Sequence, residues 1–410
     1  MRILLINQYY PPDTAATAHM AQEVAEVLAE RHEVVVLAGR PSYDPAFHHP
    51  YYLTRVEANG CGARIRRVGS TAYPRHRMTR RVSNYLSYLS LAFPAAMAMR
   101  ADLILSMTDP PVAGLLGASV ARQRGIPFVY NIRDLYPDMA LGGDIVGRGR
   151  LVDAWERMHR WALRQASRVI VLGEDMRERI AAKGIDPARI AVVRDGAALG
   201  EEVPSGAGQP AREAIRCGFP FVALHAGNLG FYGAWKTLVE AARILDGEGV
   251  GMIFVGGGAQ REQVAAMAEG IAGVRLLPFR PQAEVPFVLA AGDVHIITVK
   301  RGLEGVVVPS KLYGILAAGR PVLAVTAGNS DVARIVTGAR CGLVADPDDP
   351  ASVAAAIRQL RADPERLGEM GRRAREKARE FERGAQLRRL RETVEEAGQQ
   401  AGKFSCSEHS

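Results

Sequence analysis

The stretch from Val299 to Val325, VKRGLEGVVVPSKLYGILAAGRPVLAV, is the clearest indication of fold in this 410-residue chain. It contains a loop, a short helix and a buried strand in that order. Ser310 is the predicted N-cap of the helix and Gly319 the residue that closes its C-terminus. Pro321 prevents the helix from continuing into the apolar run that ends at Val325. A loop-helix-strand unit of this kind is typical of an α/β domain.

The start of the predicted helix is basic. Its first free N–H groups lie near Leu312, and Lys311 and Arg301 are close to it in sequence. A helix N-terminus with neighbouring cations suits a phosphate or diphosphate. We therefore predict that Arg301, Ser310, Lys311 and Leu312 contribute to such a site, although an ordinary α/β unit without a ligand would show the same spacing.

Composition places the chain among globular proteins of two domains, with 48% hydrophobic and 23% charged residues. The four cysteines stand far apart and form neither a metal-ligand pair nor a disulfide framework, which favours a reducing compartment. The apolar run after Met1 is too short for a signal-peptide core, and no run reaches the ~20 apolar residues that cross a bilayer. We expect a cytoplasmic protein without a metal site.

Positive charge is concentrated in one segment, because no Asp or Glu occurs between Glu57 and Asp102. An apolar stripe at helical spacing, from Val82 to Met97, follows its arginines. We predict that segment 64–99 docks on an anionic membrane surface. The alternative is a core helix with a basic approach loop. Nucleic acid is not expected, because the basic block has Tyr73 but no series of aromatic residues placed for base stacking. The arginines are Arg64, Arg66, Arg67, Arg75, Arg77, Arg80, Arg81 and Arg100.

Strands and helices alternate through both halves of the chain, which predicts two Rossmann-like, doubly wound parallel sheets. We place the first domain at residues 1–195 and the second at 196–362. The helical segment 363–398 is expected to pack back on the first domain, and residues 399–410 to form a disordered tail.

Two glycine-rich turns follow successive predicted strands of the second half. Glycine lets a ligand approach the backbone closely, so both turns are candidate ligand contacts. Ligands of such sheets bind at the carboxyl ends of the strands. The residues predicted to contribute are Gly227, Asn228, Gly230, Gly256 and Gly258.

Glu304-Gly305, Pro309 and the sequence Ala317-x-Gly319-x-Pro321-Val322 resemble the donor-binding segment of retaining family 4 glycosyltransferases. The resemblance implies the GT-B fold, in which two Rossmann-like domains face each other across the active-site cleft. It also implies a nucleotide-sugar donor, retention of configuration and neither metal nor cofactor. The run PSKLYGILAAGRP is similar to the branch that builds bacterial surface polysaccharides.

The same resemblance implies roles for individual residues. Glu304 is the predicted catalytic residue that holds the sugar hydroxyls. Arg133-Asp134 is similar to a loop of the polysaccharide branch, which makes Asp134 a candidate contact of the acceptor hydroxyl or the donor sugar; a salt-bridged turn is the alternative. Phe279 and Arg280 match the loop that lies against the base. Asp13 and His19 are candidates on the acceptor side, with a plain surface histidine as the alternative for His19.

Two departures from the family pattern concern the donor phosphates. Gly314 stands where a second glutamate is usual, and Asn228 and Gly233 stand where the family has an Arg and a Lys. One of four cations has to substitute for that pair. These are Lys236, Arg280, Arg301 and Lys311.

The sequence thus predicts a hexosyl- or N-acetylhexosaminyltransferase that acts on a polyprenyl-diphosphate-linked sugar at the inner face of the plasma membrane. Its expected partners are a nucleotide sugar, the lipid-linked acceptor and anionic lipid. A natural-product glycosyltransferase with a soluble acceptor, or a nucleotide-binding module without catalysis, is the alternative.

Overall fold

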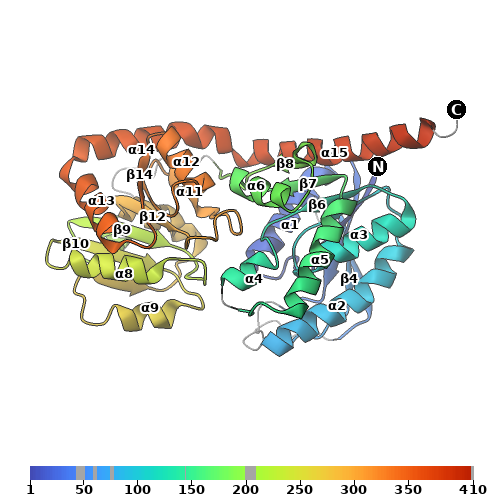
Figure 1. Cartoon of the computed structure of the whole chain (residues 1–410), viewed down its shortest axis with the longest axis horizontal. Helices are drawn as coiled ribbons and strands as arrows, with labels where there is room; N and C mark the ends of the chain where they lie inside the picture. Colours follow the sequence, from blue (N-terminus) through green and yellow to red (C-terminus); the bar gives the residue numbers. More distant parts are fainter. Residues whose placement is uncertain (43–50, 59–61, 74–77, 144, 199–208, 408–410) are drawn as a thin grey trace.

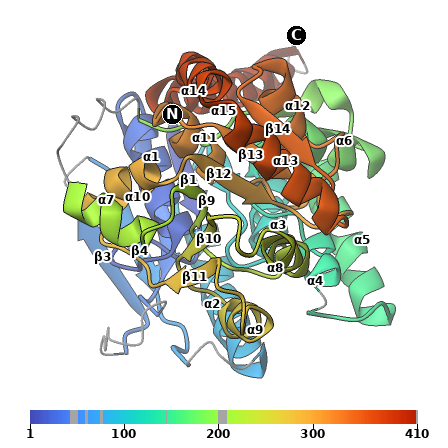
Figure 2. The same cartoon turned by 90° about the vertical axis from the view of Figure 1, so that its left-hand side faces the viewer.

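The computed structural model describes residues 1–42, 51–58, 62–73, 78–143, 145–198 and 209–407. Two α/β domains stand next to each other, and the last two helices run along one side of both (Figure 1). Figure 2 turns the second domain toward the viewer. The prediction of two doubly wound sheets is confirmed.

In the described part of the first domain, eight strands form one sheet in the order β3-β4-β2-β1-β5-β6-β7-β8. All neighbours are parallel except β3, which pairs antiparallel with β4 at the edge. The strands are β1 (Arg2–Ile6), β2 (Glu33–Gly39), β3 (Thr54–Ala58), β4 (Arg64–Val68), β5 (Leu103–Ser106), β6 (Phe128–Asn131), β7 (Arg168–Val171) and β8 (Ile190–Val192).

Helices cover both faces of this sheet because alternate residues of its apolar strands point to opposite sides. In β1, Leu4 and Ile6 join the core under α2, α3, α5 and α6. Ile3 and Leu5 join the core under α1 and α15. The helices of this domain are α1 (Ala16–Ala29), α2 (Met78–Ala98), α3 (Ala113–Arg124), α4 (Asp138–Gly142), α5 (Arg150–Gln165) and α6 (Glu174–Ala182), followed by a 3₁₀ turn at Pro187–Arg189.

The second sheet, as far as the described residues extend, has six parallel strands in the order β11-β10-β9-β12-β13-β14. The order reverses between β9 and β12, so the loops after these strands meet at the topological switch point where such sheets bind ligands. The strands are β9 (Phe221–Ala226), β10 (Val250–Val255), β11 (Val274–Leu277), β12 (Val294–Thr298), β13 (Val322–Val325) and β14 (Gly342–Ala345).

The helices of the second domain also lie on both faces of its sheet. One face is covered by α8, α9 and α13, and the other by α7, α10, α11 and α12. Their bounds are α7 (Gln209–Arg216), α8 (Trp235–Ile244), α9 (Arg261–Met267), α10 (Val285–Ala291), α11 (Lys311–Ala317), α12 (Asp331–Gly338), α13 (Pro350–Ala362) and α14 (Pro364–Ala378), with 3₁₀ turns at Gln282–Glu284 and Arg379–Phe381.

Helix α15 (Arg383–Ser407) returns the chain to the first domain. Its buried Leu390 and Val394 pack with α1 residues in one apolar cluster. Arg391, also buried, makes an ion pair with Glu30 at the end of α1. The helix continues past residue 399, where we predicted a disordered tail, and residues 408–410 lie outside the described part of the chain.

The predicted docking segment 64–99 divides into parts with different surroundings. Arg67 is buried in β4, where it donates to Glu57 at 2.8 Å and to the Gly39 carbonyl oxygen at 3.2 Å. Arg67 is therefore a core residue of the sheet, in contrast to the expected surface role. Arg75 and Arg77 lie outside the described residues. No helix in the described ranges is long and apolar enough to cross a membrane.

Candidate active site

The two glycine-rich turns of the second domain pack against each other after β9 and β10. A Cβ added at Gly256 would lie 2.0 Å from the Gly227 carbonyl oxygen, and one at Gly258 would lie 2.2 Å from Asn228 Oδ1. All three glycines have φ between +130° and +147°. Their lack of a side chain is therefore required by the contact between the turns. Gly230 belongs to the same turn and accepts a hydrogen bond from the Trp235 indole at 2.7 Å.

Lys311 reaches beneath the first of these turns. Its Nζ lies 3.1 Å from Nε2 of the buried His225 and 3.1 Å from the place that a Cβ at Gly227 would occupy. Burial lowers the pKa of Lys311 to about 7. A desolvated cation thus lies directly under a turn that has no side chain to cover it.

The other three predicted phosphate cations have different surroundings. Arg301 is exposed and pairs with Asp346 at 2.6 Å and Asp348 at 2.5 Å, so its guanidinium is held by the loop that follows β14. Nη1 of Arg280 lies 3.9 Å from Oε2 of Glu284, four residues later in the chain. Lys236 is on the exposed face of α8. In the described part of the chain, Lys311 alone has side-chain atoms within 4 Å of the position that a Cβ at Gly227 would occupy.

The start of α11 differs from the predicted N-cap. Ser310 has helical backbone angles and its side chain makes no capping hydrogen bond, because the chain already turns before Lys311. Leu312 is buried in the core of the second domain. Gly319 takes the left-handed conformation that we predicted for the helix end, with φ +64°.

Phe279 lies at the rim of the glycine turns. Its side chain is 62% exposed, and Cε2 lies 3.1 Å from the position of a Cβ at Gly257. The ring is therefore available to a flat ligand above the second turn, and its predicted role beside the base stays a prediction.

Glu304 lies on the loop between β12 and α11. Its Oε2 accepts the Gly302 N–H at 2.8 Å. Its Oε1 is buried and has no hydrogen-bond partner among the residues that the structure describes. A buried carboxylate oxygen without a donor is suited to a ligand hydroxyl, which agrees with the predicted contact to the sugar.

The first domain fixes this loop from the other side. Arg179 of α6 donates to the carbonyl oxygens of Gly302, at 2.6 Å, and of Glu304. The Leu135 N–H donates to the Val306 carbonyl oxygen at 3.1 Å. The position of Glu304 therefore depends on contacts between the two domains.

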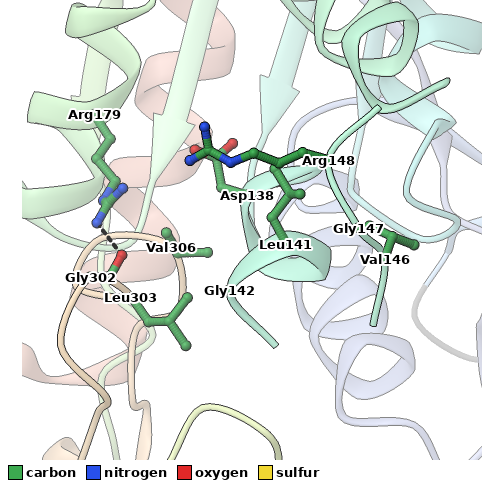
Figure 3. A pocket seen from close by; sticks show the side chains of 10 residues that line it. All are labelled: Asp138, Leu141, Gly142, Val146, Gly147, Arg148, Arg179, Gly302, Leu303 and Val306. Atoms are coloured by element: carbon green, nitrogen blue, oxygen red, sulfur yellow. Dashed lines mark hydrogen bonds between the residues drawn. The ribbon is translucent and has the colours of Figure 1, made fainter. Parts of the chain in front are cut away.

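A pocket of about 430 Å³ lies where this loop meets the first domain (Figure 3). Charged side chains of the first domain line it together with apolar residues of both domains, and Figure 3 shows Arg179 reaching to Gly302 at its edge. Its lining consists of Asp138, Leu141, Gly142, Val146, Gly147, Arg148, Arg179, Gly302, Leu303 and Val306.

Arg133 forms an ion pair with Asp195, next to the glycine at which the chain leaves the first domain. Both side chains are largely buried. This is the salt-bridged turn that was the alternative reading of the loop, and it ties β6 to the hinge. Arg133 is accordingly placed as a support of the loop that carries Asp134.

Asp134 lies in the same loop and faces the second domain. Burial, together with the charges of Asp109 and Asp195, raises its pKa to about 6 against the opposing charge of Arg133. The Asp134 charge in turn contributes, after burial, to raising the pKa of Tyr232 to about 12. Tyr232 belongs to the second domain and donates to the Asn228 carbonyl oxygen at 3.0 Å.

The two acceptor-side candidates lie on different parts of the first domain. Asp13 is buried and accepts the Ser42 N–H at 2.8 Å, so it fixes the loop after β1. His19 is exposed on α1. No group of three or more His, Cys, Asp or Glu side chains suited to a metal occurs in the described residues.

Sequence reasoning missed His225, Arg179 and Tyr232. A histidine inside the apolar run Phe221–Ala226 was a visible signal, because polar residues in buried strands need partners. The sequence around Arg179 contained no such signal, since an arginine on an amphipathic helix is normally a surface residue.

Known families account for both domains. The family model "Glycosyl transferase 4-like domain" matches residues 15–196, and "Glycosyl transferases group 1" matches residues 220–363. The chain belongs to the family 4 glycosyltransferases. It is accordingly a retaining glycosyltransferase that depends on a nucleotide sugar.

Two curated relatives and one solved structure illustrate this membership. The probable glycosyltransferase WbjE of Pseudomonas aeruginosa is 26% identical over 301 residues, which are 70% of this chain and 74% of the relative. The putative colanic acid biosynthesis glycosyl transferase WcaI of Escherichia coli (strain K12) is 23% identical, over 88% of this chain and 92% of its own. Anabaena Alr3699/HepE, solved with UDP and glucose, is 19% identical with a TM-score of 0.70 over 97% of this chain and 100% of that one, which confirms the GT-B fold.

Proposed function

We propose that this glycosyltransferase transfers a hexosyl or N-acetylhexosaminyl group to a polyprenyl-diphosphate-linked sugar in the synthesis of a cell-surface polysaccharide. The name of WcaI, with its role in colanic acid biosynthesis, supports this class of product. HepE is described with UDP, which favours a UDP-linked sugar as the first donor to test.

The proposal of a lipid-linked acceptor is supported by an apolar and basic edge of the first domain. Along α2, the predicted apolar stripe is divided: Leu89, Phe93 and Met97 pack against the core, whereas Val82 is 43% and Leu86 61% exposed. β3 pairs with β4, which contacts α2, so exposed side chains near β3 belong to the same edge. The exposed apolar residues there are Tyr51, Leu53, Val56, Tyr73, Val82 and Leu86.

Arginines accompany these apolar side chains. Arg80 and Arg81 precede Val82 in the first turn of α2. Each Lys or Arg near an anionic bilayer contributes about 1 kcal/mol to binding, and inserted apolar side chains add to it. An edge of this composition suits the cytoplasmic surface of a membrane that contains the lipid-linked acceptor.

The proposed reaction uses the groups described above. The bond between the anomeric carbon and the diphosphate breaks, and the acceptor oxygen bonds to that carbon on the face that the diphosphate leaves. A phosphate oxygen takes the acceptor proton. Glu304 orients the transferred sugar, Asp134 contacts the acceptor hydroxyl, and cations near the Gly227 turn stabilise the charge of the leaving diphosphate.

The donor is tested by thermal shift with UDP-, GDP- and CDP-linked sugars. A donor that binds only the folded protein raises its stability by about 2.7 kcal/mol at one hundred times Kd. One class of donor should raise the melting temperature, and slow hydrolysis of the same donor should follow. A module without catalysis would bind but release no sugar.

The membrane surface is tested by sedimentation with vesicles that contain phosphatidylglycerol. We expect the wild-type protein to sediment at low salt and to be released by 0.5 M salt or by R80E/R81E, because salt screens such attraction within about one Debye length. R366E/R389E is the matched control, since both arginines are exposed on α14 and α15 at the opposite side of the molecule. Efficient transfer to a soluble acceptor without vesicle binding would support the natural-product alternative instead.

A further inference from the structure

A half-buried lysine and a buried histidine form a pair beneath the Gly227 turn. Lys311 Nζ lies 3.1 Å from His225 Nε2, and the other ring nitrogen, Nδ1, lies 3.2 Å from the carbonyl oxygen of Ile296. The two residues come from α11 and β9, 86 positions apart in the chain. Lys311 makes no ion pair with a carboxylate in the described part of the chain.

The surroundings determine which nitrogen of the ring carries the proton. Burial, and after it the charge of Lys311, lowers the pKa of His225 well below its usual value, so the ring is neutral; the carbonyls of Ile296 and Asn228 oppose the shift and His295 adds to it. A carbonyl oxygen can only accept, so Nδ1 carries the proton toward Ile296. Nε2 is left as the acceptor for the ammonium group of Lys311.

The histidine ring is held rigidly. The Trp235 ring meets it edge to face at a centroid distance of 4.8 Å, and Phe254 lies at 6.3 Å. The Trp235 indole is itself fixed by its hydrogen bond to the Gly230 carbonyl oxygen at 2.7 Å. The direction of the lysine is thus set by a ring that cannot rotate freely.

The other side of the ammonium group faces the Gly227 turn. An alanine there would bring its Cβ to 3.1 Å from Nζ, so glycine leaves the cation uncovered by a side chain. One hydrogen bond to a neutral imidazole does not balance a desolvated ammonium charge. An anion over the turn would supply the missing countercharge.

We propose that Lys311 is the cation that binds the diphosphate of the donor over the Gly227 turn, and that His225 is the positioning residue that aims its ammonium group at this anion. The proposal rests on the proposed function, because it assigns a diphosphate-containing donor to this site. During transfer the bond to the anomeric carbon breaks and both electrons stay with the diphosphate. Lys311 lies where it can stabilise that added charge.

The test is calorimetry with UDP, GDP and uridine on the full chain. Lys311→Met should weaken diphosphate binding between tenfold and one hundredfold, the usual range for a hydrogen bond to a charged group, and leave uridine binding unchanged. Arg243→Met, an exposed cation of α8, is the matched control and should leave both unchanged. Wild-type affinity for the diphosphate in Lys311→Met would overturn the proposal.

The role of His225 is tested by variants that keep or remove the hydrogen-bond acceptor that faces Lys311. His225→Gln places an amide oxygen near the former Nε2 and should retain most of the affinity, whereas His225→Leu should lose it about tenfold. In the Lys311→Met background His225→Leu should have no further effect on diphosphate affinity, because the two act as one unit. Additive losses would show a merely structural histidine. Should His225→Leu not fold, the Gln variant and the single Lys311 variant decide.

A pH series gives an independent readout. Since the pKa of Lys311 is about 7, its unliganded form loses the proton above that pH, and binding of UDP has to take one up. Wild-type affinity for UDP should fall about tenfold or more from pH 7.5 to 9.0, and Lys311→Met should be flat. A wild type that binds no nucleoside diphosphate would contradict the proposed function, whereas binding that ignores Lys311 would contradict this inference alone.

Discussion

Asp134, the proposed contact of the acceptor hydroxyl, carries a cost to stability. Its carboxyl is half-buried, and this desolvation together with two nearby acids raises its pKa from 3.8 to about 6. A raised carboxyl pKa means that the folded protein favours the protonated form. The stability that the neutral form contributes is present at low pH and is lost as pH rises toward and through about 6.

Asp134→Asn should therefore stabilise the protein at pH 8 while it lowers kcat. The amide keeps the shape but has no charge to bury, so the gain approaches about 3 kcal/mol at pH 8 and is small at pH 4. Urea unfolding at both pH values measures it. A gain that does not change with pH would contradict the assignment of the buried charge.

Glu304 offers the second prediction at this scale. Only its Oε1 lacks a partner, in the described residues, because Oε2 holds the Gly302 N–H. Glu304→Gln should lower kcat at least about one hundredfold and leave the Kd for the nucleoside diphosphate nearly unchanged, since the sugar is mispositioned but the phosphates are not. Kinetics as fast as the wild type would remove Glu304 from the reaction.

At the scale of helices and strands, local sequence patterns predicted the features that local interactions determine. Apolar runs and glycine positions gave the strands and the end of α11 at Gly319. The sequence could not show that Arg67 is buried, because its partners Glu57 and the Gly39 carbonyl come from two other strands. His225 was missed for the same reason, since its partner Lys311 stands 86 positions away in the chain.

Helix α15 supports the first domain although it ends the chain. Leu390 is buried between this helix and α1, so Leu390→Ala should cost about 2–4 kcal/mol of unfolding free energy through the cavity that it leaves. Arg389→Ala, on the exposed side of the neighbouring position, should change it by less than about 0.5 kcal/mol. Equal effects in urea unfolding would show that α15 is not docked in solution.

At the scale of the whole molecule, contacts between the two domains hold the loop of Glu304 in place. Glu304 is held by Arg179 of the first domain, and Gly305 fits against the Asp175 backbone, where a Cβ would lie 2.5 Å from the carbonyl oxygen. The sequence predicted the two α/β sheets, because the pattern of each is encoded within one domain. It did not predict the residues that join them, since these come from segments more than 100 positions apart.

Two ion pairs across the domains differ in burial and allow a matched test. Arg194 Nη2 donates to the buried Asp331 at 3.0 Å, and the Asp331 N–H donates to Asp175 Oδ2 at 3.0 Å. Arg334 pairs with Glu178 at 2.8 Å, but both side chains are exposed. A buried pair that loses one partner leaves a charge without compensation, whereas an exposed pair contributes about 0–1 kcal/mol.

Asp331→Asn should therefore separate the domains more readily than Arg334→Ala. We expect a loss of about 3 kcal/mol in unfolding free energy for Asp331→Asn, because Arg194 stays largely buried without a carboxylate, and a larger radius of gyration by small-angle scattering. Arg334→Ala should leave both nearly unchanged. Since opening removes Arg179 from the loop of Glu304, kcat should fall in Asp331→Asn. Identical scattering and stability for the two variants would mean that the buried pair does not hold the closed arrangement.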